Sequence, residues 1–172
     1  MDDKDLKVEM DALLAVLRDQ NGNELDRAKA VVGLEKFVKK EVVEELLHVL
    51  ENDLQHKVRG NAASVLGAIA GKTVVPTLMQ VLGADLDPEV RELAAAALGR
   101  VGDSRAIPAL TAALEQDEDE DTRERCAEAL GRMNSVRAWR ALSDAGATET
   151  DPGVAHFIIR AKSELAKKAR ES

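Results

Sequence analysis

Apolar residues recur along this chain at helical spacing, in short stripes that are separated by polar turns. Between Val90 and Val101 they return every three or four positions, as they do along one face of an α-helix. Gly102 then provides a stop signal, and a second stripe extends from Ile107 to Leu114. The pattern predicts two consecutive helices in this part of the chain.

The same pair of helices recurs at a fixed interval. Three segments align without gaps and begin at Val58, Val90 and Thr122, each 32 residues after the one before it. A further step in each direction reaches Asp26 and Val154, where related patterns begin. Repeated units of this kind stack, so that each buries its apolar face against its neighbours. The sequence therefore predicts an all-α protein, an α-solenoid that forms a right-handed superhelix. Its single domain, 1–172, is expected to contain about five helix pairs, at about 6–38, 41–70, 73–101, 104–133 and 136–169.

Glycines recur at one position of these units. Gly67, Gly99 and Gly131 each fall late in the helix that opens an aligned segment. A glycine inside a helix costs about 1 kcal/mol relative to alanine, so three at one position indicate a reason in the packing. We expect a neighbouring helix to approach closely at each of them.

Prolines mark the entry to the following helix. Pro76 and Pro108 occupy matching positions near a helix start, where the missing N–H costs little. Trp139 and Arg140 replace the Ile-Pro pair in the last full unit, so we expect a different entry turn there.

The segment DPEVRELAAAALGRVGDSRAIPALTAAL, which begins at Asp87, resembles the HEAT repeats, in particular the short subtype named after phycobilisome lyases. The resemblance is strong over about residues 56–144. It implies a structural ladder between units, formed by an Asp before a helix and an Arg within it, as at Asp87 and Arg91 or at Asp119 and Arg123.

The ladder that this resemblance implies is expected to be incomplete. The arginine column continues back to Arg59 and Arg27, but Asn23 and Gln55 stand in place of the aspartate. At the other end of the chain, Ala155 interrupts the arginine column.

Composition and charge narrow the classes of partner. Apolar residues make up 45% of the 172 positions and aromatic residues only 2%, which suits a core of close-packed helices. The net charge of -8 argues against nucleic acid or an anionic membrane, since both require clustered Lys and Arg. One cysteine permits no internal disulfide, the acidic N-terminus does not resemble a signal peptide, and no apolar run could span a bilayer. We therefore expect a cytoplasmic protein, and polar outer faces on the end helices favour a monomer.

Three groups of residues invite a chemical role, and for each the sequence favours a structural one. His48, His56 and His156 fall in different units without the spacing of metal ligands. The acidic run from Glu115 to Asp121 lacks the glycine of a calcium loop and is interpreted as a solvated turn. Cys126 aligns with alanines at a buried position and is expected to be a small core residue. No catalytic, cofactor-binding or metal-binding residue is assigned, and we do not expect an enzyme.

Two alternatives follow from the family resemblance. Deoxyhypusine hydroxylase, a metal-dependent HEAT-repeat enzyme, is identified by His-Glu dipeptides, and none occurs in this sequence. An accessory or chaperone-like subunit of the phycobilin-lyase type, acting on a modified protein, stays open as the second hypothesis. The shared residues are those that build the repeats, so they indicate fold rather than activity. The favoured function is a scaffold or adaptor that binds another protein.

The second helix of each pair is expected to line the concave face, a surface that repeat proteins commonly use for partners. The middle of this face is small and apolar with arginines beside it, which predicts a groove for a peptide or helix whose carboxylates the arginines hold. The predicted partner-binding residues are Asn61, Ser64, Leu93, Ala96, Arg100, Arg125, Glu128, Arg132, Phe157 and Arg160. The alternative is a solvated surface with charge pairs along each helix and no single partner.

Overall fold

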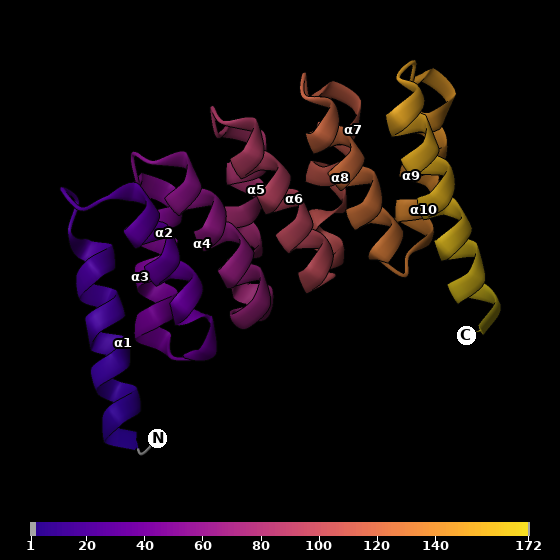
Figure 1. The fold of residues 1–172 in the computed structure, drawn as a ribbon. Helices are drawn as coiled ribbons and strands as arrows, with labels where there is room; N and C mark the ends of the chain where they lie inside the picture. The colour runs from indigo at the N-terminus through magenta and orange to yellow at the C-terminus, as the bar shows by residue number, and fades with distance from the viewer. Residues whose placement is uncertain (1–2, 172) are drawn as a thin grey trace.

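A computed structural model describes residues 3–171 as a stack of ten α-helices joined by short turns (Figure 1). The helices are α1 (Asp3–Arg18), α2 (Glu24–Gly33), α3 (Lys40–Asn52), α4 (His56–Ile69), α5 (Val75–Ala84), α6 (Pro88–Val101), α7 (Ile107–Gln116), α8 (Glu120–Arg132), α9 (Val136–Thr148) and α10 (Pro152–Glu171). Within these residues there is no β-strand, and no helix is long and apolar enough to cross a membrane. The chain is all-α, as the sequence predicts.

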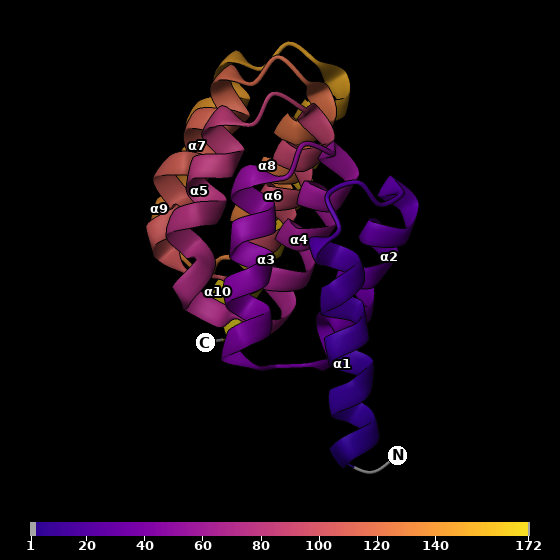
Figure 2. The same cartoon turned by 90° about the vertical axis from the view of Figure 1, so that its left-hand side faces the viewer.

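The helices alternate between two rows. We call α2, α4, α6, α8 and α10 the inner row, and α3, α5, α7 and α9 the outer row (Figure 1; Figure 2). Consecutive helices of the inner row make extensive contact, whereas consecutive helices of the outer row touch much less. A stack bends toward the side on which its helices are closer together. The chain is therefore an α-solenoid whose inner row lines the concave face.

Three glycines set the close spacing of the inner row. A Cβ atom built on each would lie 2.6–2.8 Å from the Cβ atom of an alanine on the next inner helix, closer than real Cβ atoms approach. The pairs are Gly67–Ala97, Gly99–Ala129 and Gly131–Ala161. Any side chain at these glycines would push the two helices apart, so the predicted close approach is confirmed.

The core is a continuous apolar layer between the two rows. The first helix of each pair contributes one leucine at a matching position, and all five are at most 1% exposed: Leu14, Leu46, Leu78, Leu110 and Leu142. Burying such a side chain stabilises the fold by about 2 kcal/mol. Because each leucine is covered only when neighbouring units are in place, the stack is stable as a whole rather than unit by unit.

The first helix departs from this regular stacking. In the second view, α1 lies over the N-terminal end of the stack, apart from the line of the outer row (Figure 2). Arg18 occupies the position at which the next three units bury Leu50, Leu82 and Leu114, and its guanidinium binds the Glu45 carboxylate at 2.6 Å. A charged residue thus stands where the regular units bury a leucine, and α1 contacts α3 less than consecutive outer helices contact each other.

Candidate functional site

An arginine near the start of each of four inner helices joins two successive turns. The Nε and Nη2 atoms of Arg59 donate to the two carboxylate oxygens of Asp85 at 2.8 and 2.7 Å, and Nη1 donates to the main-chain carbonyl of Asp53 at 2.9 Å. Arg91 repeats this arrangement one unit later, with both distances to the Asp117 carboxylate at 2.8 Å and the carbonyl of Asp85 at 3.0 Å. Such two-pronged, charge-assisted pairs are strong and geometrically specific. They fix each turn to the unit before it.

The arginine ladder continues toward both ends of the stack. Arg27, only 1% exposed, binds the carboxylate of Asp53 and donates to the main-chain carbonyl of Leu17 at 3.1 Å. Arg123 donates to the carbonyl of Asp117 at 3.0 Å and lies 3.6 Å from the Glu149 carboxylate. The four arginines therefore link five successive turns.

The acidic partner lies two residues earlier in the sequence than the resemblance implied. The expectation that Asp87 and Asp119 pair with the arginines is wrong: they cap α6 and α8, accepting hydrogen bonds from backbone N–H groups at 3.0 and 2.8 Å. Asn23 caps α2 in the same way, and Gln55 also lies outside the ladder, so these substitutions leave no gap. The true acidic column is Asp53, Asp85, Asp117 and Glu149.

Ionisation of the Asp85 carboxyl, one of the ladder acids, is favoured by its partners. Burial opposes the charged form of Asp85, but hydrogen bonds from Arg59 and from the backbone N–H of Asp87 outweigh it and hold the pKa of the Asp85 carboxyl below its usual range. A carboxyl with a lowered pKa contributes stability that is lost as the pH falls through that pKa. The ladder is thus a structural device of the inner row.

All ten residues predicted for partner binding lie on the inner row. They are Asn61 and Ser64 on α4, Leu93, Ala96 and Arg100 on α6, Arg125, Glu128 and Arg132 on α8, and Phe157 and Arg160 on α10. The three residues Arg100, Arg132 and Arg160 are exposed, and the other seven are half-buried. Part of this half-burial reflects packing between helices, because a Cβ atom on Gly60 would lie 2.8 Å from Leu93 Cδ1.

The arginines of this face differ in whether they already have partners. Arg125 lies between Glu92 and Glu128, with N–O distances of 2.6 and 2.8 Å. Arg100 and Arg132 make no ion pair with any other residue in the part of the chain that the structure describes. Of the three arginines beside the predicted groove, two are therefore available to an incoming carboxylate.

A small hollow of about 190 Å³ adjoins Arg132, between α8 and α10. The structure brings four predicted residues together here, Glu128, Arg132, Phe157 and Arg160. The guanidinium of Arg160 lies 3.8 Å from Glu128 and 3.4 Å from Glu164, long distances for ion pairs at a half-exposed surface. Asn61 and Ser64, two inner helices away, do not line this hollow.

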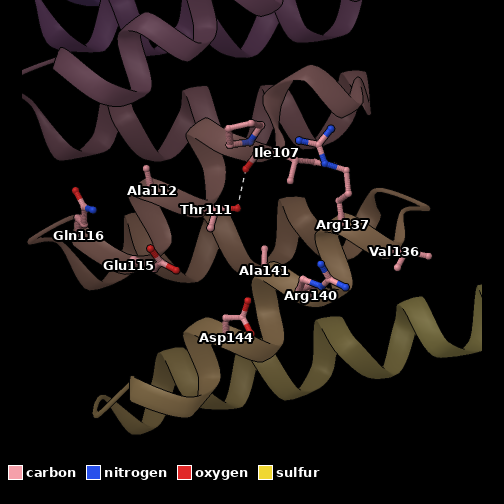
Figure 3. Close-up of a pocket in the computed structure, with 11 residues that line it drawn as sticks. Ile107, Thr111, Ala112, Glu115, Gln116, Val136, Arg137, Arg140, Ala141 and Asp144 are labelled. Atoms are coloured by element: carbon pink, nitrogen blue, oxygen red, sulfur yellow. Dashed lines mark hydrogen bonds between the residues drawn. The ribbon is translucent and has the colours of Figure 1, made fainter.

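A second surface, which the sequence reasoning did not assign, lies on the outer row between α7 and α9 (Figure 3). It is a groove of about 540 Å³ whose lining includes Ile107, Ala112 and Ala141. Figure 3 shows Arg137 and Arg140 toward one end of this groove. The opposite end carries Glu115 and Gln116.

The entry to α9 differs from the entries to α5 and α7. Val75 and Ile107 follow 3-10 turns and are 1% and 4% exposed. Trp139 occupies the matching position after a turn without a 3-10 helix and is 46% exposed. Its ring turns toward α10, where the Lys162 ammonium lies 5.2 Å from the ring centroid. The expected difference in this entry turn is confirmed.

Comparison with known proteins decides the family. The HEAT-repeat model matches residues 10–98 and 75–161, which together cover most of the chain. The chain belongs to the HEAT-repeat family. Among solved structures, this HEAT chain resembles the complex of CpcE and CpcF of phycocyanin lyase from Nostoc sp. PCC7120, with a TM-score of 0.72, 21% identity, and coverage of 90% of this chain and 98% of that chain. Human deoxyhypusine hydroxylase in complex with glycerol gives a TM-score of 0.46 at 16% identity, over 93% of this chain and 96% of that chain. A search of curated proteins finds no match.

The other residues that invited chemistry are dispersed over the HEAT stack. His48 and His156 are exposed, and His56 lies 3.8 Å from Asp87. Across residues 3–171, no three His, Cys, Asp or Glu side chains are placed to hold a metal ion. Cys126 is fully buried, and this burial raises the pKa of its thiol above the usual range. The interpretation of Cys126 as a small core residue of a HEAT unit is confirmed.

The acidic run from Glu115 to Asp121 covers the end of α7, the turn 117–119 and the start of α8. Asp117 belongs to the arginine ladder and Asp119 caps the helix, while the side chain of Glu118 is 92% exposed. The expectation of a solvated turn therefore needs a correction, because two of its carboxylates hold HEAT units together. Partial burial and the neighbouring acidic charges also raise the pKa of Glu124.

Proposed function

We propose that this HEAT-repeat protein is a scaffold or adaptor that binds another protein on its inner row. One observation carries the proposal: Arg100 and Arg132 are exposed and unpaired at matching positions of α6 and α8, whereas nearby Arg125 is neutralised by two glutamates. A guanidinium that is free on a concave face can take a carboxylate with two hydrogen bonds. The expected partner segment is a helix or extended peptide that carries acidic side chains.

The shape of the inner row supports the same function. Ser64, Ala68 and Ala96 have small side chains, and all three are at least partly exposed. Small residues let a partner's backbone approach the surface, and arginines beside a desolvated patch are typical anchors of protein interfaces. The hollow beside Phe157 is lined mainly by charged side chains, so it suits a polar group of the partner.

The proposal also excludes two classes of partner. A net charge of -8 disfavours nucleic acid and anionic membranes, so we propose a protein partner, a cytoplasmic location and a monomeric scaffold without catalytic activity. These points rest on charge, composition and the polar faces of the end helices.

A second candidate function is favoured by the likeness to the phycocyanin-lyase complex, which extends over 98% of the solved chain. On this hypothesis, the protein is an accessory or chaperone-like subunit that acts on a modified protein. Visible absorbance that copurifies with the protein would favour this candidate over a simple adaptor.

The test of the adaptor hypothesis compares two charge-reversed double variants. Partners captured from a lysate of the source organism are identified by mass spectrometry, and the affinity of the purified partner is then measured by calorimetry. Arg100→Glu with Arg132→Glu is expected to weaken binding at least tenfold. Lys167→Glu with Arg170→Glu makes the same change in net charge at exposed sites of α10 and is expected to leave binding intact. Equal binding by both variants would place the partner elsewhere on the molecule.

A further inference from the structure

The groove between α7 and α9 is independent of the inner row and suits a different ligand. It follows the α7 segment from Ile107 to Gln116, which at 1.5 Å per residue is about 14 Å long. An extended peptide covers that distance with about four residues. The groove volume of about 540 Å³ lies in the range of pockets that enclose ligands of this size.

The charges around this groove lack partners within the protein. Arg137 and Arg140 make no ion pair with any residue that the structure describes, and the same is true of Glu115 and Asp144. The ladder arginines of the same protein are all paired. Two unpaired arginines above an apolar floor are arranged to receive a carboxylate from outside.

Helix stability does not explain the two arginines. They lie in the first turns of α9, whose first turn contains no acidic residue. The N-terminal end of a helix carries partial positive charge, so cations there reduce helix stability and anions increase it. The same field adds to the attraction that Arg137 and Arg140 exert on a negatively charged group.

We infer that the α7–α9 groove is a docking site for an extended segment of another protein, about four residues long, with a carboxylate at one end and apolar side chains in the middle. The carboxylate binds Arg137 and Arg140, and the apolar side chains cover Ile107 and Ala141. A basic or polar residue at the other end lies near Glu115, so the segment and the groove are complementary in charge at both ends.

A random heptapeptide library displayed on phage tests this inference without assuming the ligand. The full-length protein is the bait, and Arg137→Glu with Arg140→Glu is the counter-selection. We expect the sequences that depend on the groove to place an acidic residue next to apolar ones. As synthetic peptides, they are expected to bind the double variant at least tenfold more weakly. Sequences without an acidic residue, or with equal affinity for both proteins, would overturn the inference.

Three controls separate this site from its alternatives. Arg100→Glu with Arg132→Glu is expected to leave the selected peptides bound, so failure of the inner-row hypothesis does not affect this one. Ala112→Trp fills the groove from an exposed position without changing charge and is expected to reduce binding similarly. Analytical ultracentrifugation tests whether the protein self-associates. If it does, and the Arg137 and Arg140 changes abolish the association, the occupant of the groove is a second copy of the chain and the peptide assignment is overturned.

Discussion

The inner and outer rows contain helices of comparable length, yet they are spaced differently. In the inner row, glycines face alanines and the ladder arginines are paired with acids, so neighbouring helices lie in close contact. In the outer row the helices separate, and grooves open on both sides of α7. The column of glycines therefore sets the curvature of the stack, because close packing of the inner helices separates the outer helices.

The largest effect is expected where the inner row holds a buried charge pair. Arg91→Ala removes both hydrogen bonds to Asp117 and leaves that carboxylate without its partner. Breaking such a pair costs about 3 kcal/mol of unfolding free energy. Urea denaturation followed by circular dichroism measures this loss.

The matched control is an arginine of the same row outside the ladder. Arg160→Ala removes a half-exposed group whose ion pairs are long, so we expect a loss below about 0.5 kcal/mol. If the two variants lost the same stability, the ladder would have no special role in joining the units.

A smaller effect is expected from adding one methyl group at the closest approach of the inner row. Gly99→Ala places a Cβ atom 2.8 Å from the Cα and Cβ atoms of Ala129. Overpacking of this kind costs about 1–3 kcal/mol, which exceeds the gain of about 1 kcal/mol in helix propensity. We expect a net loss of up to about 2 kcal/mol and a straighter stack, measured by thermal unfolding and by small-angle X-ray scattering.

A glycine-to-alanine substitution in the outer row is expected to raise stability instead of lowering it. A Cβ atom on Gly83 in α5 would have no heavy atom of a neighbouring element within 4 Å. Gly83→Ala should therefore raise stability by about 0.5 kcal/mol through helix propensity alone. If Gly83→Ala also destabilised the protein, the free space around a glycine would not determine the effect of the added methyl group.

The smallest effect concerns Cys126 in the core of the inner row. The matching positions in the three preceding units are buried alanines, so Cys126→Ala should change stability by less than about 1 kcal/mol. Cys126→Ser buries a hydroxyl and should cost about 1 kcal/mol more than Cys126→Ala. A thiol reagent should modify the native protein only as fast as it unfolds, and rapid labelling of the folded protein would contradict a purely structural cysteine.

The repeat architecture could be predicted from the sequence because its interval and its glycines are local signals. The ladder acid could not be assigned correctly, because Asp85 and Asp87 both belong to columns with the same interval. The sequence gives the position of a residue within its unit, whereas the pairing of Arg59 with Asp85 depends on how adjacent units are offset.

The residues predicted to bind a partner lie on the inner row, but which of their charges are already paired depends on contacts between units. Arg125 is neutralised by Glu92 from the preceding inner helix, and Leu93 packs over Gly60. The different entry to α9 had the replacement of an Ile-Pro pair at Trp139 as its signal. The direction of that side chain depends on Lys162, which belongs to another helix.

The glycine–alanine contacts have a consequence for how such an array changes in length. On α6, Ala97 fills the space left by Gly67 on one side, and Gly99 receives Ala129 on the other. The inner helices α6 and α8 therefore each carry both halves of the joint, and the three joints from α4 to α10 have the same form. Whole units can be gained or lost by duplication or deletion while every remaining joint stays intact, whereas an insertion that shifts the interval within a unit separates the two halves.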